Sequence, residues 1–267
     1  MKKTRILPEH PRAKSLMIRE RLVEQFEKGV VATAGLLAHG RGEAFDYLLG
    51  EKTSSNALEA IRAAAAILLM AKYPVISVNG NAAALTARDI VKLAEVIKAR
   101  IEVNLFHRSI ERETAIKKLL EEAGAKEVLG VGEAASAKIP EVASKRRRVD
   151  PNGILAADVV LVPLEDGDRT QALVGIGKKV IAIDLNPLSR TSQFADITIV
   201  DNIVRAMPTL KKTAEKLKKE DREKLQEITS SYDNKKNLSQ AIRQIKQRLL
   251  KLAEKGTYLM ILEESRI

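Results

Sequence analysis

Five short apolar runs rich in Val and Ile alternate with helical segments through the middle of the chain. Runs of this length and composition are typical of buried β-strands, and the segments between them carry apolar residues at helical spacing. Strands that alternate with helices favour an α/β fold with a mostly parallel sheet flanked by helices. The expected strands are residues 74–79, 101–106, 157–163, 179–185 and 197–200, with a further short one at 128–129.

We expect the whole chain, residues 1–267, to form a single α/β domain around this sheet. Residues 1–73 form its N-terminal helical part, 74–202 its core and 203–267 its C-terminal helical part. A break at 230–234 favours a C-terminal helical hairpin, and residues 258–262 suit a last strand. The expected helices are 11–28, 55–73, 84–98, 109–123, 169–174, 207–219 and 222–254.

Composition narrows the classes of function. Aromatic residues make up only 3% of the 267 residues, which leaves few platforms for stacking nucleic-acid bases. The absence of Cys excludes disulfides, thiolate catalysis and Cys-ligated zinc, and it fits a reducing cytoplasm. A net charge of +11 indicates anionic partners, namely nucleic acid, anionic lipid or phosphorylated metabolites. No apolar run reaches the length of a membrane span, so we expect a cytoplasmic protein.

Each expected strand is followed by a loop rich in small polar residues, Gly or Arg. The carboxyl ends of parallel strands and the N-termini of helices meet at one edge of such a sheet, where ligands bind. These loops therefore predict a shared ligand site, although ordinary turn chemistry explains any one of them. The loops begin at Asn79, His107, Leu164, Leu185 and Asp201.

Arginines near these strand ends are candidate phosphate ligands, because a guanidinium group holds phosphate through two parallel hydrogen bonds. Gly40 and Gly42 flank Arg41 and would let the backbone approach a ligand closely. For any single arginine, a solvated surface charge is the alternative. His39 and His107 also lie in candidate ligand loops, and a buried structural role fits them equally well. The arginines are Arg19, Arg41, Arg108, Arg169 and Arg190.

The sequence has no GxxxxGK[ST] loop, so ATP would have to bind differently from a P-loop enzyme. Three scattered histidines without Cys make a poor zinc site. Mg²⁺ with phosphate oxygens would suit the aspartates at strand ends, although Asp201-Asn202 also fits the N-cap of the next helix. The aspartates are Asp166, Asp168, Asp184 and Asp201.

Two other functions compete. The basic run at 145–148 is either a nucleic-acid patch or, more commonly, a solvated loop. The stretch 130–135 is similar to the dinucleotide fingerprint of a nicotinamide-dependent oxidoreductase. That signal is weak, because the preceding strand is very short and Pro140 interrupts any helix behind it.

Four stretches, at 35–51, 77–85, 162–170 and 183–191, resemble archaeal phosphopantothenate synthetases, and the resemblance extends over nearly the whole chain. It implies a homodimer with a Rossmann-like core and a requirement for ATP and Mg²⁺. The implied reaction condenses 4-phosphopantoate with β-alanine through a phosphopantoyl-adenylate, and it releases AMP and pyrophosphate in coenzyme A biosynthesis. Nucleic acid and membranes are not expected partners.

The resemblance also implies roles for individual residues. Arg41, His107 and Arg190 are the expected catalytic residues, while the metal ligands and the base for the β-alanine amine stay open. The expected 4-phosphopantoate ligands are Asn81, His107, Arg108 and Arg169. The expected nucleotide ligands are Arg19, Arg41, Asp184, Leu185, Asn186, Ser189, Arg190, Asn202 and Ile203.

Overall fold

A five-stranded parallel sheet forms the centre of the molecule, in a computed structural model that describes residues 6, 7, 9, 10, 12–139, 142 and 144–256. The strand order is β2-β1-β5-β6-β7, and each pairing is parallel, which confirms the predicted α/β fold class. The short strand expected at 128–129 is present only as a bridge between Glu102 and Leu129. The strands are β1 (Pro74–Val78), β2 (Arg100–Val103), β5 (Val159–Pro163), β6 (Lys179–Ile183) and β7 (Ile197–Ile199).

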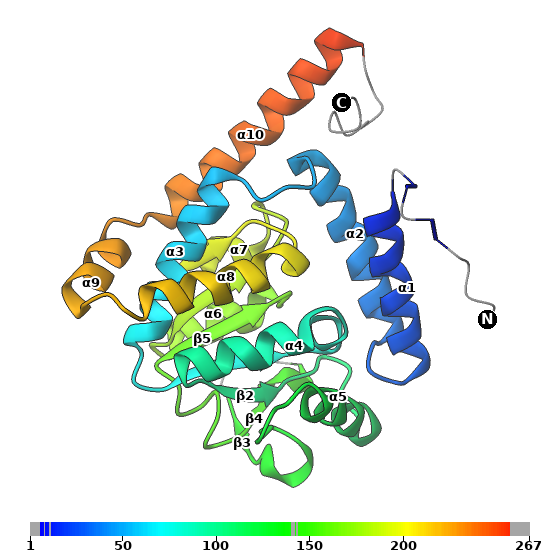
Figure 1. The fold of residues 1–267 in the computed structure, drawn as a ribbon. Helices are drawn as coiled ribbons and strands as arrows, with labels where there is room; N and C mark the ends of the chain where they lie inside the picture. The colour runs from blue at the N-terminus through cyan, green and yellow to red at the C-terminus, as the bar shows by residue number, and fades with distance from the viewer. Residues whose placement is uncertain (1–5, 8, 11, 140–141, 143, 257–267) are drawn as a thin grey trace.

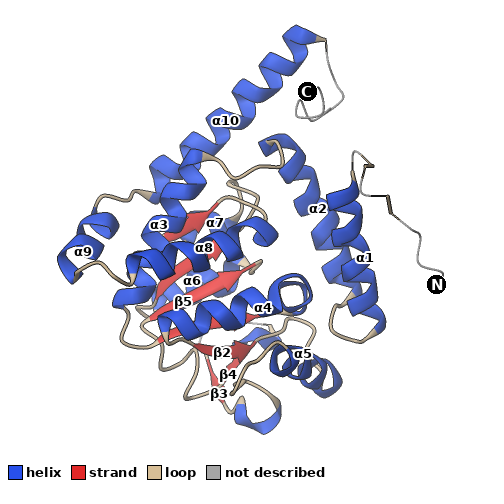
Figure 2. Ribbon diagram, in the orientation of Figure 1, coloured by secondary structure: helices blue, strands red, loops and turns tan. Residues whose placement is uncertain are grey.

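Helices cover the sheet and extend beyond it (Figure 1). The expected helices are confirmed, and the break at 230–234 separates the last two. A small antiparallel pair, β3 (Ala137–Lys138) and β4 (Arg148–Val149), lies beside the end of β2 (Figure 2). The strand expected at 258–262 falls outside the described residues. The helices are α1 (Ala13–Glu27), α2 (Thr33–Leu49), α3 (Ser55–Met70), α4 (Gly80–Ile97), α5 (Ile110–Glu122), α6 (Gly167–Gly175), α7 (Arg190–Phe194), α8 (Ile203–Leu217), α9 (Arg222–Ser230) and α10 (Asn234–Lys255).

Helix α2 was not predicted as a helix. Its sequence combines an apolar run with three glycines, which weaken a helix in isolation. One of these glycines is required by packing, because a Cβ atom at Gly35 would lie 2.3 Å from Oδ1 of Asn81. The close approach lets Nδ2 of Asn81 donate to the Gly35 carbonyl at 2.8 Å. Contact with the first turn of α4 therefore helps to hold α2 in place.

The two faces of the sheet bury different helices, because side chains along a strand alternate between faces. Ile76 and Leu161 pack on one side, in a core cluster with residues of α3, α4 and α8. Val75 and Val160 pack on the other side, with residues of α6 and the segment 139–157. All four side chains are fully buried. Two apolar layers therefore enclose the sheet, as its near-continuous Val and Ile runs indicate.

The strand order reverses between β1 and β5, and one side chain joins the two strand ends there. Asn79 follows β1 and is the N-cap of α4, since its Oδ1 accepts a hydrogen bond from the Ala82 N–H at 3.1 Å. Its Nδ2 donates to the carbonyls of Pro163 at 2.9 Å and Leu164 at 3.0 Å, directly after β5. Ligands of open α/β sheets bind outside the carboxyl ends of the strands at such a point.

A buried carboxylate on β2 holds the turn that follows β4. Oε1 of Glu102 accepts from the Asp150 N–H at 3.2 Å, and Oε2 accepts from the Ile154 N–H at 2.6 Å. Gly153 passes so close that an added Cβ would lie 2.0 Å from Oε2. Burial raises the pKa of Glu102 to about 7, although the two N–H donors and the charge of Arg169 act in the opposite direction.

This pKa predicts that stability falls as the pH rises from 5 to 8. An unfolded Glu has a pKa of about 4.3, so between pH 5 and about pH 7 the folded state retains a proton that the unfolded state has lost. The stabilisation is complete below the unfolded pKa and is lost as the pH rises through about 7. The expected loss in the free energy of unfolding is about 3 kcal/mol. Urea unfolding at several pH values should show a weaker pH dependence for Glu102→Gln, and identical slopes for the two proteins would contradict this account.

Candidate functional site

A cavity of about 660 Å³ opens at the carboxyl ends of the strands, where the strand order reverses. Its wall combines α2, the start of α8 and the loops after β1, β2, β5 and β6. This volume is typical of pockets that bind small molecules. The predicted meeting of the strand-end loops at one site is therefore confirmed.

The cavity brings together most of the residues singled out from the sequence. Five of them lie outside its wall, namely Arg19, Arg108, Asp168, Arg169 and Asp201. Arg169 instead borders a smaller neighbouring cavity of about 180 Å³. The residues in the main wall are Arg41, Asn81, His107, Asp184, Leu185, Asn186, Ser189, Arg190, Asn202 and Ile203.

The loop after β6 is a compact turn built around Asp184. Oδ1 of Asp184 accepts from the Asn186 N–H at 2.9 Å, and Oδ2 accepts from the Ser189 hydroxyl. The same hydroxyl oxygen accepts from the Ser192 N–H at 3.0 Å and so caps α7. Burial raises the pKa of Asp184, while these two hydrogen bonds and the nearby charge of Arg41 oppose the shift. The turn is therefore formed by the chain itself and presents its residues to the cavity in a fixed arrangement.

Arg41 faces this turn from α2. It is exposed at the cavity and makes no hydrogen bond or ion pair within the described part of the chain. The expectation that Arg41 and His39 lie in a loop is wrong, because both are in a helix. Gly40 and Gly42 are helical too, and each has room for a Cβ atom in the protein itself. Arg41 therefore contributes its side chain to the cavity wall, and the two glycines are not needed to bring the backbone close to a ligand.

Arg190 lies at the first turn of α7, on the other side of the turn after β6. Its guanidinium pairs with Asp168 and donates to Oε1 of Gln171 at 2.8 Å. Both Arg190 and Asp168 are exposed, so the pair is accessible to solvent and to a ligand. Arg190 therefore keeps a charge at the cavity wall without being buried in it.

The other end of the cavity lies around the N-terminus of α4 and the loop after β2. The His107 side chain is exposed there, and its ring lies edge-on to Phe106 with 4.9 Å between ring centroids. Arg112 donates to the carbonyls of His107 and Val30, so it joins this loop to the segment before α2. Burial lowers the pKa of His39, which favours a neutral imidazole in the wall at neutral pH.

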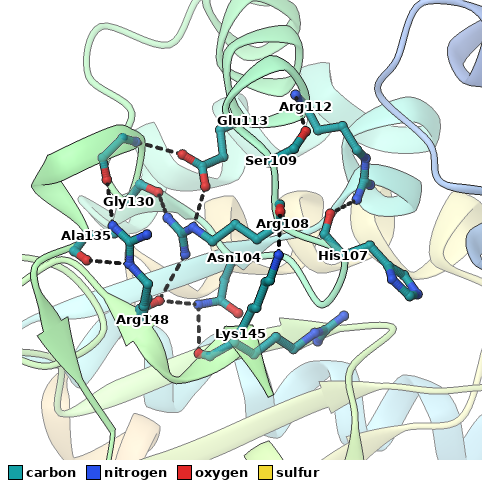
Figure 3. Close-up of polar contacts among 12 residues, drawn as sticks. Asn104, His107, Arg108, Ser109, Arg112, Glu113, Gly130, Ala135, Lys145 and Arg148 are labelled. Atoms are coloured by element: carbon teal, nitrogen blue, oxygen red, sulfur yellow. Dashed lines mark hydrogen bonds and ion pairs between the residues drawn. The ribbon is translucent and has the colours of Figure 1, made fainter.

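Arg108 and Arg169 are buried and bonded to the protein rather than directed into this cavity. Arg108 pairs with Glu113 and donates to the carbonyls of Gly130 and Arg148, as Figure 3 shows. Arg169 donates to the Ser77 hydroxyl at 3.1 Å and pairs with Glu165. Burial lowers the pKa of Arg169 to about 10, still well above neutral pH. The buried positions of Arg108 and Arg169 indicate that these residues stabilise the structure behind the cavity wall.

Arg19 is also occupied, at the contact between α1 and α2. Its Nη2 lies 2.6 Å from Oε2 of Glu43, and its Nε lies 3.0 Å from the same oxygen. Burial alone would raise the pKa of Glu43, but hydrogen bonds from Arg19 and Tyr47 lower it below its ordinary value. This ion pair ties the two helices together.

Arg146 is a residue of the cavity wall that the sequence does not single out. The basic run at 145–148 was interpreted as a solvated loop or a nucleic-acid patch, and Arg147 and Arg148 are indeed exposed. Arg146 is only 6% exposed and lies in the cavity wall. Nothing in the local sequence distinguishes it from its neighbours, because its burial depends on contacts with residues after β5.

The candidate metal-binding aspartates mostly have protein partners. Asp201 accepts from Thr53 and pairs with Arg205, and Asn202 caps α8 by accepting from the Val204 N–H at 3.2 Å, which confirms the N-cap interpretation. Within the described residues, no group of three or more His, Asp or Glu side chains could hold a metal ion. Any Mg²⁺ here would therefore depend largely on ligands from bound phosphates.

No helix in the described ranges is long and apolar enough to cross a membrane. The fingerprint-like stretch at 130–135 leads into a short 3₁₀ turn, Gly132–Ala134, instead of the helix that dinucleotide binding requires. This geometry disfavours the oxidoreductase alternative.

Comparisons with known proteins identify the family of this chain. A family model described as phosphopantothenate/pantothenate synthetase matches residues 56–248. A protein of Thermococcus kodakarensis named 4-phosphopantoate--beta-alanine ligase is 52% identical over 250 residues, which cover 93% of this chain and 95% of the relative. A protein of the same name from Methanosarcina mazei is 51% identical over 255 residues, covering 96% of this chain and 100% of the relative. This chain belongs to the phosphopantothenate/pantothenate synthetase family.

Proposed function

We propose that this chain is an ATP-dependent ligase that joins 4-phosphopantoate to β-alanine in coenzyme A biosynthesis, releasing AMP and pyrophosphate. One observation carries the proposal beyond family membership. The wall of the main cavity gathers four arginines, the N-terminus of the 15-residue helix α8 and the first turn of α4, which is kinked at Thr86. Such a wall suits two phosphorylated substrates, because guanidinium groups and helix N-termini both favour phosphate. The arginines are Arg41, Arg112, Arg146 and Arg190.

The proposed chemistry follows from the substrates. A carboxylate is a poor acylating agent because its oxygen leaves badly, and transfer of AMP to that oxygen supplies a better leaving group. The enzyme must hold the carboxylate oxygen, the α-phosphorus and the departing pyrophosphate in line. It must also stabilise the charge that develops on the phosphate oxygens. No covalent enzyme nucleophile is needed, which suits a chain without Cys.

We place ATP at the end of the cavity formed by Arg41, the loop after β6 and the start of α8. Arg41 and Arg190 would neutralise its phosphates from opposite sides of the turn around Asp184. Asn202 holds the α8 N-terminus in the wall, and its Nδ2 is bonded to Asp46 at 2.8 Å. Mg²⁺ would bind mainly through nucleotide phosphates, where it would neutralise charge. Asp184 is the wall carboxylate that belongs to the turn beside these phosphates.

We place 4-phosphopantoate at the end around α4, with Asn81 and His107 as its proposed polar contacts. Asn81 lies in the first turn of α4 and His107 in the loop after β2, and both residues line the cavity. Arg108 and Arg169 would act indirectly, because their buried contacts support the wall from behind. Arg19 would act on the nucleotide only indirectly as well, through the position of α2.

The homodimer also remains part of the proposal. Its support is the resemblance together with apolar side chains that this chain leaves exposed. Leu37 of α2 is 74% exposed, and α10, which extends away from the sheet in Figure 1, exposes Leu249 and Leu250. Light scattering at micromolar concentration would measure the molar mass in solution and so test whether the chain is a dimer. We also propose that the whole chain acts as one ligase domain in the cytoplasm, without nucleic-acid or membrane partners.

The products distinguish the proposed route. With Mg-ATP, 4-phosphopantoate and β-alanine, the protein should form phosphopantothenate, AMP and pyrophosphate in equal amounts, measured by chromatography. With β-alanine omitted, it should still exchange labelled pyrophosphate into ATP, because the adenylate forms reversibly. Production of ADP and phosphate would replace the adenylate with an acyl phosphate. Absence of nucleotide turnover, together with salt-sensitive binding to duplex DNA, would favour the nucleic-acid alternative.

Arg41→Ala should lower kcat/KM for ATP by about 10- to 100-fold, because it removes a charged phosphate contact. Arg88→Ala is the matched control, since Arg88 is an exposed arginine on α4 outside the cavity wall. Steady-state kinetics of both variants would check the prediction. Equal kinetics for Arg41→Ala and the wild-type protein would show that Arg41 does not bind the nucleotide.

A further inference from the structure

Arg146 is a buried cation in the wall of a substrate cavity. Its exposed fraction is 6%, whereas Lys145, Arg147 and Arg148 of the same run are exposed. A guanidinium group loses much of its hydration when it is buried, so such a position needs compensating charge. Burial lowers the pKa of Arg146 to about 10, which keeps it charged at neutral pH.

The compensating charge comes from the loop after β5, and it is shared. Arg146 pairs with Glu165, and its Nε lies 3.1 Å from Oδ2 of Asp166. Glu165 also pairs with the fully buried Arg169, so one buried carboxylate serves two buried guanidinium groups. The Asp166 side chain is 43% exposed, so it can turn away when a stronger anion arrives. Arg146 is therefore held in place without being fully neutralised.

A separate set of contacts holds the backbone of this segment against β2 (Figure 3). Nδ2 of Asn104, just after β2, donates to the carbonyls of Arg146 at 3.2 Å and Arg148 at 3.1 Å. Arg108 donates to the same Arg148 carbonyl at 3.1 Å. These bonds determine where the main chain of Arg146 lies, and Glu165 and Asp166 determine where its side chain points.

Arg146 shares this end of the cavity with two other positive features. The first turn of α4 reaches the wall at Gly80 and Asn81, ahead of a kink at Thr86 that divides this helix. Arg112 lies against it, because a Cβ added at Gly80 would be 3.0 Å from Nη2 of Arg112. The charge of Arg112 is close enough to Arg146 to lower its pKa further. Two guanidinium groups gathered beside the first turn of α4 are suited to an anion.

We propose that Arg146, together with Arg112, binds the phosphate group of the acyl substrate beside the first turn of α4, and that Arg108 is a positioning residue for Arg146. This inference rests on the proposed function. The acyl substrate carries a carboxylate at one end and a phosphate at the other. Its carboxylate must meet the nucleotide near the loop after β6. The phosphate then lies toward β1 and β2, where these groups are found.

The test compares 4-phosphopantoate with pantoate, which lacks only the phosphate. We would measure KM for 4-phosphopantoate and ATP, and the inhibition constant of pantoate against 4-phosphopantoate. Arg146→Ala should raise KM for 4-phosphopantoate by about 10- to 100-fold, since it removes a charged contact to phosphate. KM for ATP and the inhibition constant of pantoate should each change less than about threefold.

Arg147→Ala is the matched control. Arg147 is the next residue of the same run, and its exposed side chain makes no hydrogen bond or ion pair with the described residues. It should leave all three constants unchanged. If Arg146→Ala does not fold, Arg146→Lys keeps the charge but loses the two-pronged geometry, and it should still weaken 4-phosphopantoate binding several-fold.

Arg108→Lys tests the positioning role. It should weaken 4-phosphopantoate selectively, and it should add little to Arg146→Ala in the double variant, because both changes remove the same contact. Additive losses would show that Arg108 acts independently of Arg146.

Equal weakening of 4-phosphopantoate and pantoate by Arg146→Ala, or no change in either, would overturn the phosphate assignment. Either result, with an active wild-type enzyme, leaves the proposed ligase intact. A wild-type protein that does not turn over 4-phosphopantoate at all would instead remove the proposed function itself.

Discussion

The site depends on the three hydrogen bonds of Asn79. One bond caps α4, and the other two reach the carbonyls that follow β5, so a single side chain joins the strand ends on both sides of the reversal. Parallel strands splay apart where the strand order reverses, and this opening creates a cavity. Asn79 limits the splay and directs the α4 N-terminus into the opening. Because α2 in turn packs on Asn81, the wall that carries Arg41 is built on the same turn.

The fold could largely be predicted from local patterns. Strands such as β5 are buried on both faces of the sheet, and this burial explains why they consist almost entirely of apolar residues such as Val. The expected start of the helix after β2 agrees with the structure, where Ser109 caps α5, whereas α8 begins at Ile203 behind its Asn202 cap and not at the expected residue 207. Helix α2 escaped prediction because its stability comes from contacts with α1, α4 and α10 rather than from the propensities of its glycine-containing sequence.

The sequence predicted which loops form the candidate site. It did not predict which arginine side chains face the cavity. Arg41 and Arg108 look alike in sequence, since each lies near a glycine or a strand end. Only the fold shows that Arg41 makes no hydrogen bond or ion pair with the described residues, while Arg108 is bonded to Glu113, Gly130 and Arg148. Arg146 was hidden for the converse reason, because its acidic partners are about twenty residues away in sequence, beyond β5. Charge in a sequence does not reveal its neutralising partner.

A structure with a non-hydrolysable ATP analogue and 4-phosphopantoate would test the central claim most directly, namely that one cavity at the β1–β5 reversal holds both substrates end to end. The account predicts nucleotide phosphates between Arg41 and the turn around Asp184, and the phosphate of 4-phosphopantoate beside the α4 N-terminus and Arg146. A nucleotide at the α4 end, or either ligand bound outside this cavity, would contradict it.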